Sequence, residues 1–132
     1  MFTGIVQGKA RIHEVTGNDA LKTFAIEFPE NALNKIQQGA SVAINGTCLT
    51  VTGYNIKDKL AYFDVMNETL ALTNLDSLSN DTSVNFERAA AFGDEIGGHL
   101  MSGHIHHTTP ITRIIKDTDN CTLYFKTPAN LQ

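Results

Sequence analysis

The Asn45-Gly46 dipeptide constrains this chain more than any other feature, because it stands between two runs rich in Val, Ile and Thr. Both residues of a two-residue hairpin turn must accept positive φ, and Asn-Gly is the pair that does so most readily. The sequence therefore predicts an antiparallel hairpin with strands over residues 41–44 and 47–54, in a register that the turn fixes.

Side chains alternate along the strand that leaves this turn. Leu49 and Val51 are expected on one face, and Cys48, Thr50 and Thr52 on the other. One face would pack in a core, while the other presents a thiol and hydroxyl groups. Taken alone, this pattern fits an ordinary edge strand with a buried cysteine and solvated threonines as well as a strand that faces a ligand.

The rest of the first hundred residues is expected to form further short strands and two short helices. Strands are predicted over 2–15, 21–28, 60–65 and 83–87, and helices over 29–36 and 68–72. Six short strands at roughly ten-residue spacing indicate an all-β fold, a small six-stranded antiparallel barrel of Greek-key type. Closure of such a barrel leaves no open sheet edge.

Composition narrows the classes of partner. The chain has 132 residues, a net charge of −4 and ten thinly spread Lys and Arg residues, so it lacks the basic stripe that binds nucleic acid. No signal-like leader or membrane-length apolar run is present, which predicts a cytoplasmic protein with no membrane partner. Cys48 and Cys121 lack CxxC spacing and are expected to be free thiols in a reducing compartment.

An internal repeat appears when the sequence is shifted by 99 positions. Residues 2–6 then fall on 101–105, 23–26 on 122–125, and 29–31 on 128–130. We therefore expect a first barrel over 1–97, followed over 98–132 by a linker and the first hairpin of a second, incomplete copy, as in a truncated two-barrel protein. A lone hairpin is marginally stable, so this hairpin should be disordered, pack on the first barrel or pair with another chain.

Four stretches of the chain carry a resemblance to a known family. Residues 1–8, 45–52, 64–70 and 93–105 resemble the riboflavin synthase family of the α-chain type, a lumazine-binding family. The resemblance implies dismutation of two molecules of 6,7-dimethyl-8-ribityllumazine to riboflavin and 5-amino-6-ribitylaminouracil, a step of riboflavin biosynthesis. It implies no cofactor and no metal. It also implies a homotrimer for full-length members, with the active site between barrels of neighbouring subunits, and leaves a dimer open for this shorter chain.

The resemblance also implies the residues that contact the ligand. They are Gly4, Ile5 and Val6; Cys48, Leu49 and Thr50; Asp64, Val65, Met66, Asn67, Glu68 and Thr69; and Gly103, His104 and Ile105. Phe2, Thr3 and Ser41 match family positions close to the site. The sequence leaves open whether each opening stretch of the repeat lines the pocket of its own barrel or of the other.

Three of these residues suit the chemistry of the reaction. His104 is expected to be the base that deprotonates the acidic 7-methyl group, because imidazole titrates near the working pH. Cys48 would add to the lumazine ring as a thiolate or orient the ring or a water. Thr50 would hydrogen-bond the pteridine edge or the ribityl chain. A metal site at His104 and the neighbouring histidines is disfavoured, because no Cys or second His pair stands at zinc-site spacing.

Two other functions compete with a synthase. One is a non-catalytic lumazine- or flavin-binding protein, which would share the fold and the opening motif. The other is a truncated chain that binds the ligand without turnover. Cys48 and His104 favour the enzyme, because a carrier has no use for a thiol and an imidazole at those positions.

Overall fold

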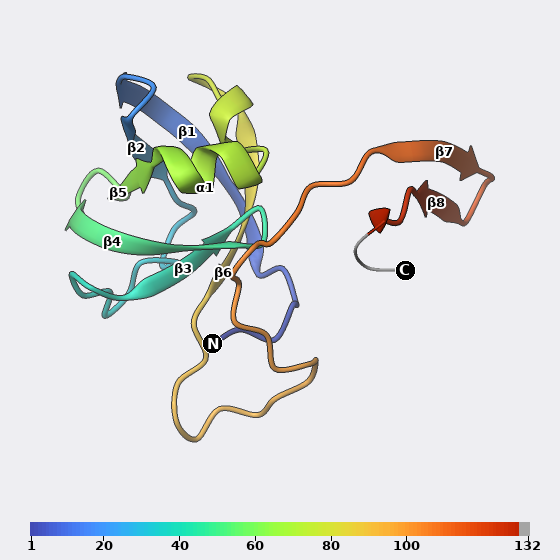
Figure 1. Cartoon of the computed structure of the whole chain (residues 1–132). Coiled ribbons are helices and arrows are strands. Elements are labelled where there is room, and N and C mark those ends of the chain that lie inside the picture. The colour runs from blue at the N-terminus through green and yellow to red at the C-terminus, as the bar shows by residue number, and fades with distance from the viewer. Residues whose placement is uncertain (130–132) are drawn as a thin grey trace.

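A computed structural model describes residues 1–129 and shows a closed antiparallel barrel (Figure 1). The strand order around it is β1-β2-β5-β4-β3-β6, and β6 pairs back to β1. The strands are β1 (Gly8–Gly17), β2 (Leu21–Glu27), β3 (Ser41–Ile44), β4 (Thr47–Asn55), β5 (Leu60–Met66) and β6 (Ser83–Arg88). Because β6 returns beside β3 after the consecutive strands β3, β4 and β5, the connection is a Greek key, and the predicted six-stranded barrel is confirmed.

The Asn45-Gly46 turn has the predicted geometry, with φ of 48° and 82°. It joins β3 to β4, and the alternation along β4 is also as predicted. Leu49 and Val51 are buried, whereas Cys48 is half-buried and Thr50 is exposed. The barrel interior is apolar, and each large side chain buried there contributes about 1.5–3 kcal/mol. The fully buried members are Ile12, Phe24, Ile26, Val42, Ile44, Val51, Phe63, Val65 and Val84.

The predicted helix over 29–36 is wrong. The segment is a series of turns, in which Asn31 and Lys35 have φ of 65° and 57°, values that no helix contains. Leu33 is buried, so the apolar spacing that suggested a helix serves the core from turns instead. The carbonyl of Asn34, which a helix would use internally, accepts a hydrogen bond from Arg88 Nη1 at 2.7 Å.

The second predicted helix is confirmed as α1 (Asn67–Leu72), which buries Leu70. A short 3-10 helix, η1 (Leu75–Ser77), follows it and was not among the predicted elements. The first strand begins at Gly8 rather than Phe2, and residues 2–7 run as an extended segment in which Phe2 forms a single bridge with Met101. No helix among residues 1–129 has the length and apolar character needed to cross a bilayer.

A second, two-stranded sheet consists of β7 (Ile111–Lys116) and β8 (Cys121–Phe125). In β1–β2, Ile12 lies opposite Ile26 and a register irregularity follows; in β7–β8, Ile111 lies opposite Phe125 and the same irregularity follows. Each pair of the second hairpin is offset by 99 residues from its counterpart, so the predicted repeat extends to strand register. Asn130, the last residue of the predicted repeat, lies outside the described residues.

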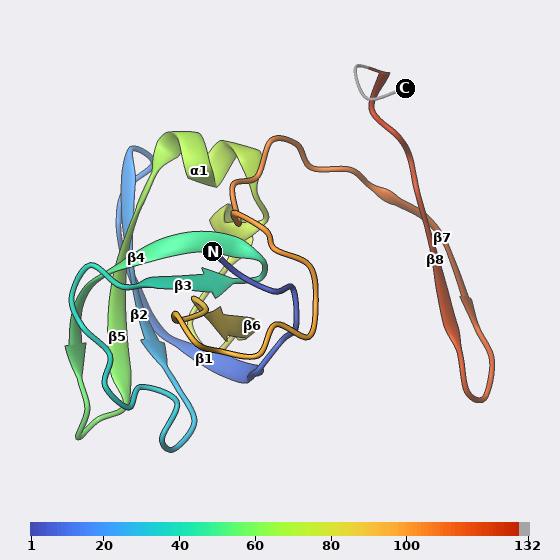
Figure 2. The ribbon, with the colours of Figure 1, turned by 90° about the horizontal axis from the view of Figure 1, so that it is seen from below.

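The β7–β8 hairpin stands apart from the barrel on an extended segment, as Figures 1 and 2 both show. All of its residues are exposed. Leu123 and Phe125 are 43% and 55% exposed, although their repeat counterparts Phe24 and Ile26 are each 1% exposed in the barrel. Of the three arrangements expected for this hairpin, packing on the first barrel is therefore not seen among the described residues, and disorder and pairing with another chain stay predictions.

Candidate functional site

A hollow of about 190 Å³ lies where β4 begins, beside α1. Its floor comes from the first barrel and one wall from the segment that opens the second repeat copy. The lining residues are Thr47, Cys48, Glu68, Thr69, Leu72, Thr73, Gly103, His104 and Ile105. Six of these, Cys48, Glu68, Thr69, Gly103, His104 and Ile105, were predicted from sequence. The structure therefore brings together residues from three of the four predicted groups.

A single backbone hydrogen bond seats the wall on the strand. The Cys48 amide donates to the Gly103 carbonyl at 2.8 Å. Gly103 has φ of 78°, and a Cβ there would lie 2.9 Å from Cys48 Cβ and 2.9 Å from Phe2 Cε2. Only glycine combines this conformation with such a close approach. The close approach of Cys48 and Phe2 thus explains why the motif has a glycine at this position. The opening of the second copy lies against the pocket of the first barrel.

The polar groups around the hollow are held locally. The His104 amide donates to Ser102 Oγ at 3.2 Å, which fixes the turn that carries the imidazole. Thr73 Oγ1 donates to the Thr69 carbonyl at 2.7 Å at the end of α1. Cys48 is a free, half-buried thiol, and Cys121 is free and exposed. The arrangement can hold a planar ring with a sulfur and an imidazole at its edge and hydroxyl and carboxylate groups from α1.

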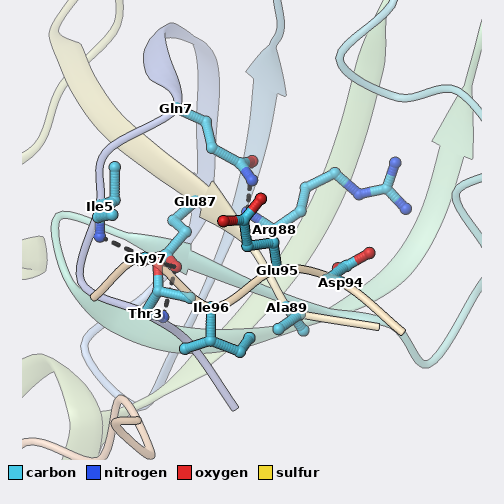
Figure 3. Close-up of a pocket in the computed structure, with 11 residues that line it drawn as sticks. Thr3, Ile5, Gln7, Glu87, Arg88, Ala89, Asp94, Glu95, Ile96 and Gly97 are labelled. Atoms are coloured by element: carbon cyan, nitrogen blue, oxygen red, sulfur yellow. Dashed lines mark hydrogen bonds between the residues drawn. The ribbon is translucent and has the colours of Figure 1, made fainter. Parts of the chain in front are cut away.

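The opening of the first copy lies elsewhere. Ile5 lines a separate hollow of about 370 Å³ between β6 and the loop 94–97 (Figure 3). Gly4 and Val6 line a small hollow of about 110 Å³ that also includes Gly103. Gly4 has φ of 80°, close to the 78° of its repeat counterpart. The two glycines thus share a positive φ, but only the second opening lines the hollow beside Cys48.

The other predicted residues lie in the barrel strands, at the start of α1 or in the amino-terminal segment. Thr50 is exposed on β4, in register with Ser41 of β3. Asp64 Oδ1 accepts a hydrogen bond from Thr23 Oγ1 at 2.7 Å. Leu49 and Val65 belong to the core, whereas Met66 is exposed and Asn67 begins α1. In the amino-terminal segment, Phe2 is buried and Thr3 Oγ1 donates a hydrogen bond to Glu87. None of these lines the hollow beside Cys48 in the described structure.

Three lining residues were missed from the sequence. Thr47 is the first residue of β4 and is buried. The alternation that placed Cys48 outward places Thr47 inward, so it did not predict that Thr47 lines the hollow. Leu72 and Thr73 lie one helical turn after Glu68 and Thr69. Helical spacing of three to four residues was the signal that could have found them, because such residues share a face.

The perturbed pKa values lie away from this hollow. A hydrogen bond from Arg11 and its charge lower the pKa of Glu27, and backbone hydrogen bonds from Asp119 and Asn120 lower the pKa of Asp117. The bond between Arg11 and Glu27 joins β1 to β2, and the bonds to Asp117 stabilise the turn between β7 and β8. Within residues 1–129, no group of three or more His, Cys, Asp or Glu side chains is placed to hold a metal ion.

The chain is similar to known proteins over most of its length. The model of the lumazine-binding domain family matches residues 3–89. Riboflavin synthase of Escherichia coli K12 is 48% identical over 126 residues, which are 96% of this chain and 58% of that protein. Riboflavin synthase of Bacillus amyloliquefaciens is 40% identical over 121 residues, which are 90% of this chain and 54% of that protein. The chain thus spans little more than half the length of these relatives.

Solved structures of LumP are also similar. LumP complexed with 6,7-dimethyl-8-(1'-D-ribityl) lumazine superposes with a TM-score of 0.85 at 30% identity, covering 100% of this chain and 72% of LumP. LumP complexed with riboflavin gives the same TM-score and identity, covering 99% and 70%.

Proposed function

The chain belongs to the lumazine-binding domain family, and on that premise we propose that it binds 6,7-dimethyl-8-ribityllumazine and riboflavin beside Cys48 as part of a riboflavin synthase. The observation that carries this proposal is the hydrogen bond from the Cys48 amide to the Gly103 carbonyl. It holds His104 on the wall of a hollow whose floor carries the thiol.

The hollow suits one face of a bicyclic ring. Enclosed sites for ligands of this size are typically about 300–1,000 Å³, whereas this one is about 190 Å³. We infer that the lining residues contact one side of the ring and leave the other side open. A second lumazine could lie on that open side, and holding two flat heterocycles face to face replaces a bimolecular encounter with a positioned one.

The proposed roles follow the lining residues. His104 takes a proton from the 7-methyl group of the bound lumazine, and its anion is delocalised into the pteridine. Cys48 orients the ring or adds to it as a thiolate. Glu68 and Thr69, on the first turn of α1, bind ribityl hydroxyl groups. Gly4, Ile5 and Val6 belong to a second site of the same kind, because they are the repeat counterparts of Gly103, His104 and Ile105.

The complete reaction extends beyond what this chain spans. We propose that the dismutation of two lumazines, with transfer of a four-carbon unit and no cofactor, requires the rest of a second barrel, in a cytoplasmic homotrimer. The chain of 132 residues by itself is then expected to bind without turnover. The competing proposal is a non-catalytic lumazine- or flavin-binding protein, and its support is that LumP, which is similar over the whole of this chain, binds both 6,7-dimethyl-8-(1'-D-ribityl) lumazine and riboflavin.

Titration with ribityllumazine and with riboflavin, followed by ligand fluorescence, tests the proposal. Both ligands should bind, and Cys48→Trp, which fills the hollow, should abolish binding. Cys121→Trp is the matched control, because Cys121 is exposed on β8 and should leave binding unchanged. Equal binding by the two variants would place the ligand elsewhere. Riboflavin production by the homogeneous chain would overturn the expectation that it cannot turn over.

A further inference from the structure

Glu87 stands out because it is a buried carboxylate. It lies on β6 and is 7% exposed, and among the described residues only Thr47 is also polar and buried. A buried charge is costly unless it is fully hydrogen-bonded. Glu87 Oε1 accepts from the Thr3 amide at 2.6 Å and from Thr3 Oγ1 at 2.7 Å (Figure 3). Glu87 Oε2 accepts from the Gly4 amide at 3.1 Å. All three donors come from the amino-terminal segment.

That segment in turn carries the chain that follows the first barrel. The Phe2 amide donates to the Met101 carbonyl at 2.8 Å, and the Met101 amide donates to the Phe2 carbonyl at 2.9 Å. The His99 amide donates to the Thr3 carbonyl at 3.0 Å. Gly98 passes so close that a Cβ there would lie 2.2 Å from the Thr3 carbonyl oxygen. Residues 98–101 therefore rest directly on residues 2 and 3.

The same contacts reach the hollow beside Cys48. Met101 stands two residues before Gly103, whose carbonyl accepts from the Cys48 amide. The buried Phe2 ring lies under Gly103, at the distance that excludes a Cβ there. A continuous path of hydrogen bonds and packing thus runs from Glu87 through Thr3 and Phe2 to the wall formed by residues 103–105.

We propose that Glu87 is a positioning residue, which acts through Thr3 and Phe2 to hold the Gly103–Ile105 wall against Cys48. The use of that wall for a ligand rests on the proposed function above, but the positioning itself does not. Loss of the carboxylate releases the wall while the barrel stays closed, because the β1–β6 and β3–β6 ladders are backbone pairings that do not involve the Glu87 side chain.

Amide hydrogen exchange tests this directly. The Cys48 amide donates to Gly103 in the wall, and the His99 and Met101 amides donate to Thr3 and Phe2 in the amino-terminal segment. In Glu87→Gln their exchange should accelerate about tenfold or more, since hydrogen bonds to a charged group are lost, while amides in the β2–β5 ladder keep their rates. A purely structural role would accelerate both sets together, and unchanged exchange at Cys48 would overturn the proposal equally.

Two further variants complete the test. Glu27→Gln is the matched control, because Glu27 lies in a strand and is ion-paired with Arg11 but does not touch the amino-terminal segment; it should leave the Cys48 amide unchanged. Thr3→Val removes one donor to Glu87 and should accelerate exchange at the same three amides. This variant tests the positioning role if Glu87→Gln does not fold.

Ligand affinity separates the two proposals. If the unaltered chain binds ribityllumazine, Glu87→Gln should weaken that binding about tenfold, in parallel with exchange at Cys48. If the unaltered chain binds no lumazine, the proposed function fails, while faster exchange at the Cys48, His99 and Met101 amides of Glu87→Gln would still support the positioning role of Glu87.

Discussion

Phe2 and Met101 are counterparts in the internal repeat, and they pair with each other through two reciprocal backbone hydrogen bonds of 2.8 and 2.9 Å. When equivalent residues pair in an antiparallel manner, the two segments are related by a local twofold axis. The neighbouring glycines follow the same relation, because a Cβ on Gly4 would meet Met101 and a Cβ on Gly103 would meet Phe2. The wall beside Cys48 is therefore one half of a symmetric arrangement.

Substitution of Gly103 should open the candidate site. Gly103→Ala places a methyl group 2.9 Å from Cys48 Cβ at a positive φ, so the wall must move. We expect ribityllumazine affinity to fall about tenfold or more, for a conformational cost of about 1–2 kcal/mol. Gly39→Ala is the control, because Gly39 also has positive φ but a Cβ there meets nothing within 4 Å. Equal affinities for the two variants would contradict this account.

The β7–β8 hairpin should be dispensable for the barrel. It shares no ladder with the barrel strands, so a chain ending at residue 108 should keep the Tm of the barrel and its affinity for ribityllumazine. A chain ending at residue 97 also lacks the wall residues 103–105 and should lose most of that affinity. Calorimetric unfolding and ligand titration of both chains check this, and equal affinity would show that the wall does not contribute.

His104 should act on the proton of the 7-methyl group. In deuterated solvent, the chain should accelerate exchange of these methyl protons in bound ribityllumazine, and His104→Gln should lose about a hundredfold or more of that acceleration. This measurement by NMR does not depend on complete turnover. His13→Gln, on β1, is the control. Undiminished exchange in His104→Gln would assign the base elsewhere.

The ion pair between Arg11 and Glu27 should make stability depend on acid. Arg11 Nη2 donates to Glu27 Oε2 at 2.5 Å, and this bond and charge hold the pKa of Glu27 below its ordinary 4.5. A carboxyl group with a lowered folded pKa stabilises the fold above its unfolded pKa, and this contribution is lost as the pH falls through the lowered value.

Removal of Arg11 tests this pH dependence. In Arg11→Met the pKa of Glu27, followed by carboxyl NMR, should rise toward 4.5, and the loss of stability below that pH should become shallower. Lys9→Met removes a positive charge from the same strand without removing this bond. An unchanged pKa in Arg11→Met would show that the ion pair is not maintained in solution.

Local sequence signals predicted the barrel well where one residue type dictates one conformation. Asn45 and Gly46 both required positive φ, and their turn fixed the register of β3 and β4. The segment over 29–36 was mispredicted because buried Leu33 and Ile36 have helical spacing, and the competing contact from Arg88, more than 50 positions away, leaves no local signal. Tertiary contact overrode propensity there.

The candidate site was predictable only in part, because contacts between residues far apart in the sequence also shape it. Cys48 and its outward direction followed from alternation along one strand. The approach of Gly103 to Cys48 depends on the Phe2–Met101 pairing, which the repeat did not reveal, although it paired the two positions in sequence. The role of Glu87 was invisible, because its three donors stand more than 80 residues earlier in the chain.

The most direct test of the central claim is an NMR titration of the chain with ribityllumazine, followed through the backbone amides. We predict the largest shifts at Cys48, Glu68, Thr69 and His104, which line the hollow beside α1. Shifts centred instead on Glu95 and Ile96, which line the larger hollow beside Glu87, would contradict the claim and move the binding site to the other side of the amino-terminal segment.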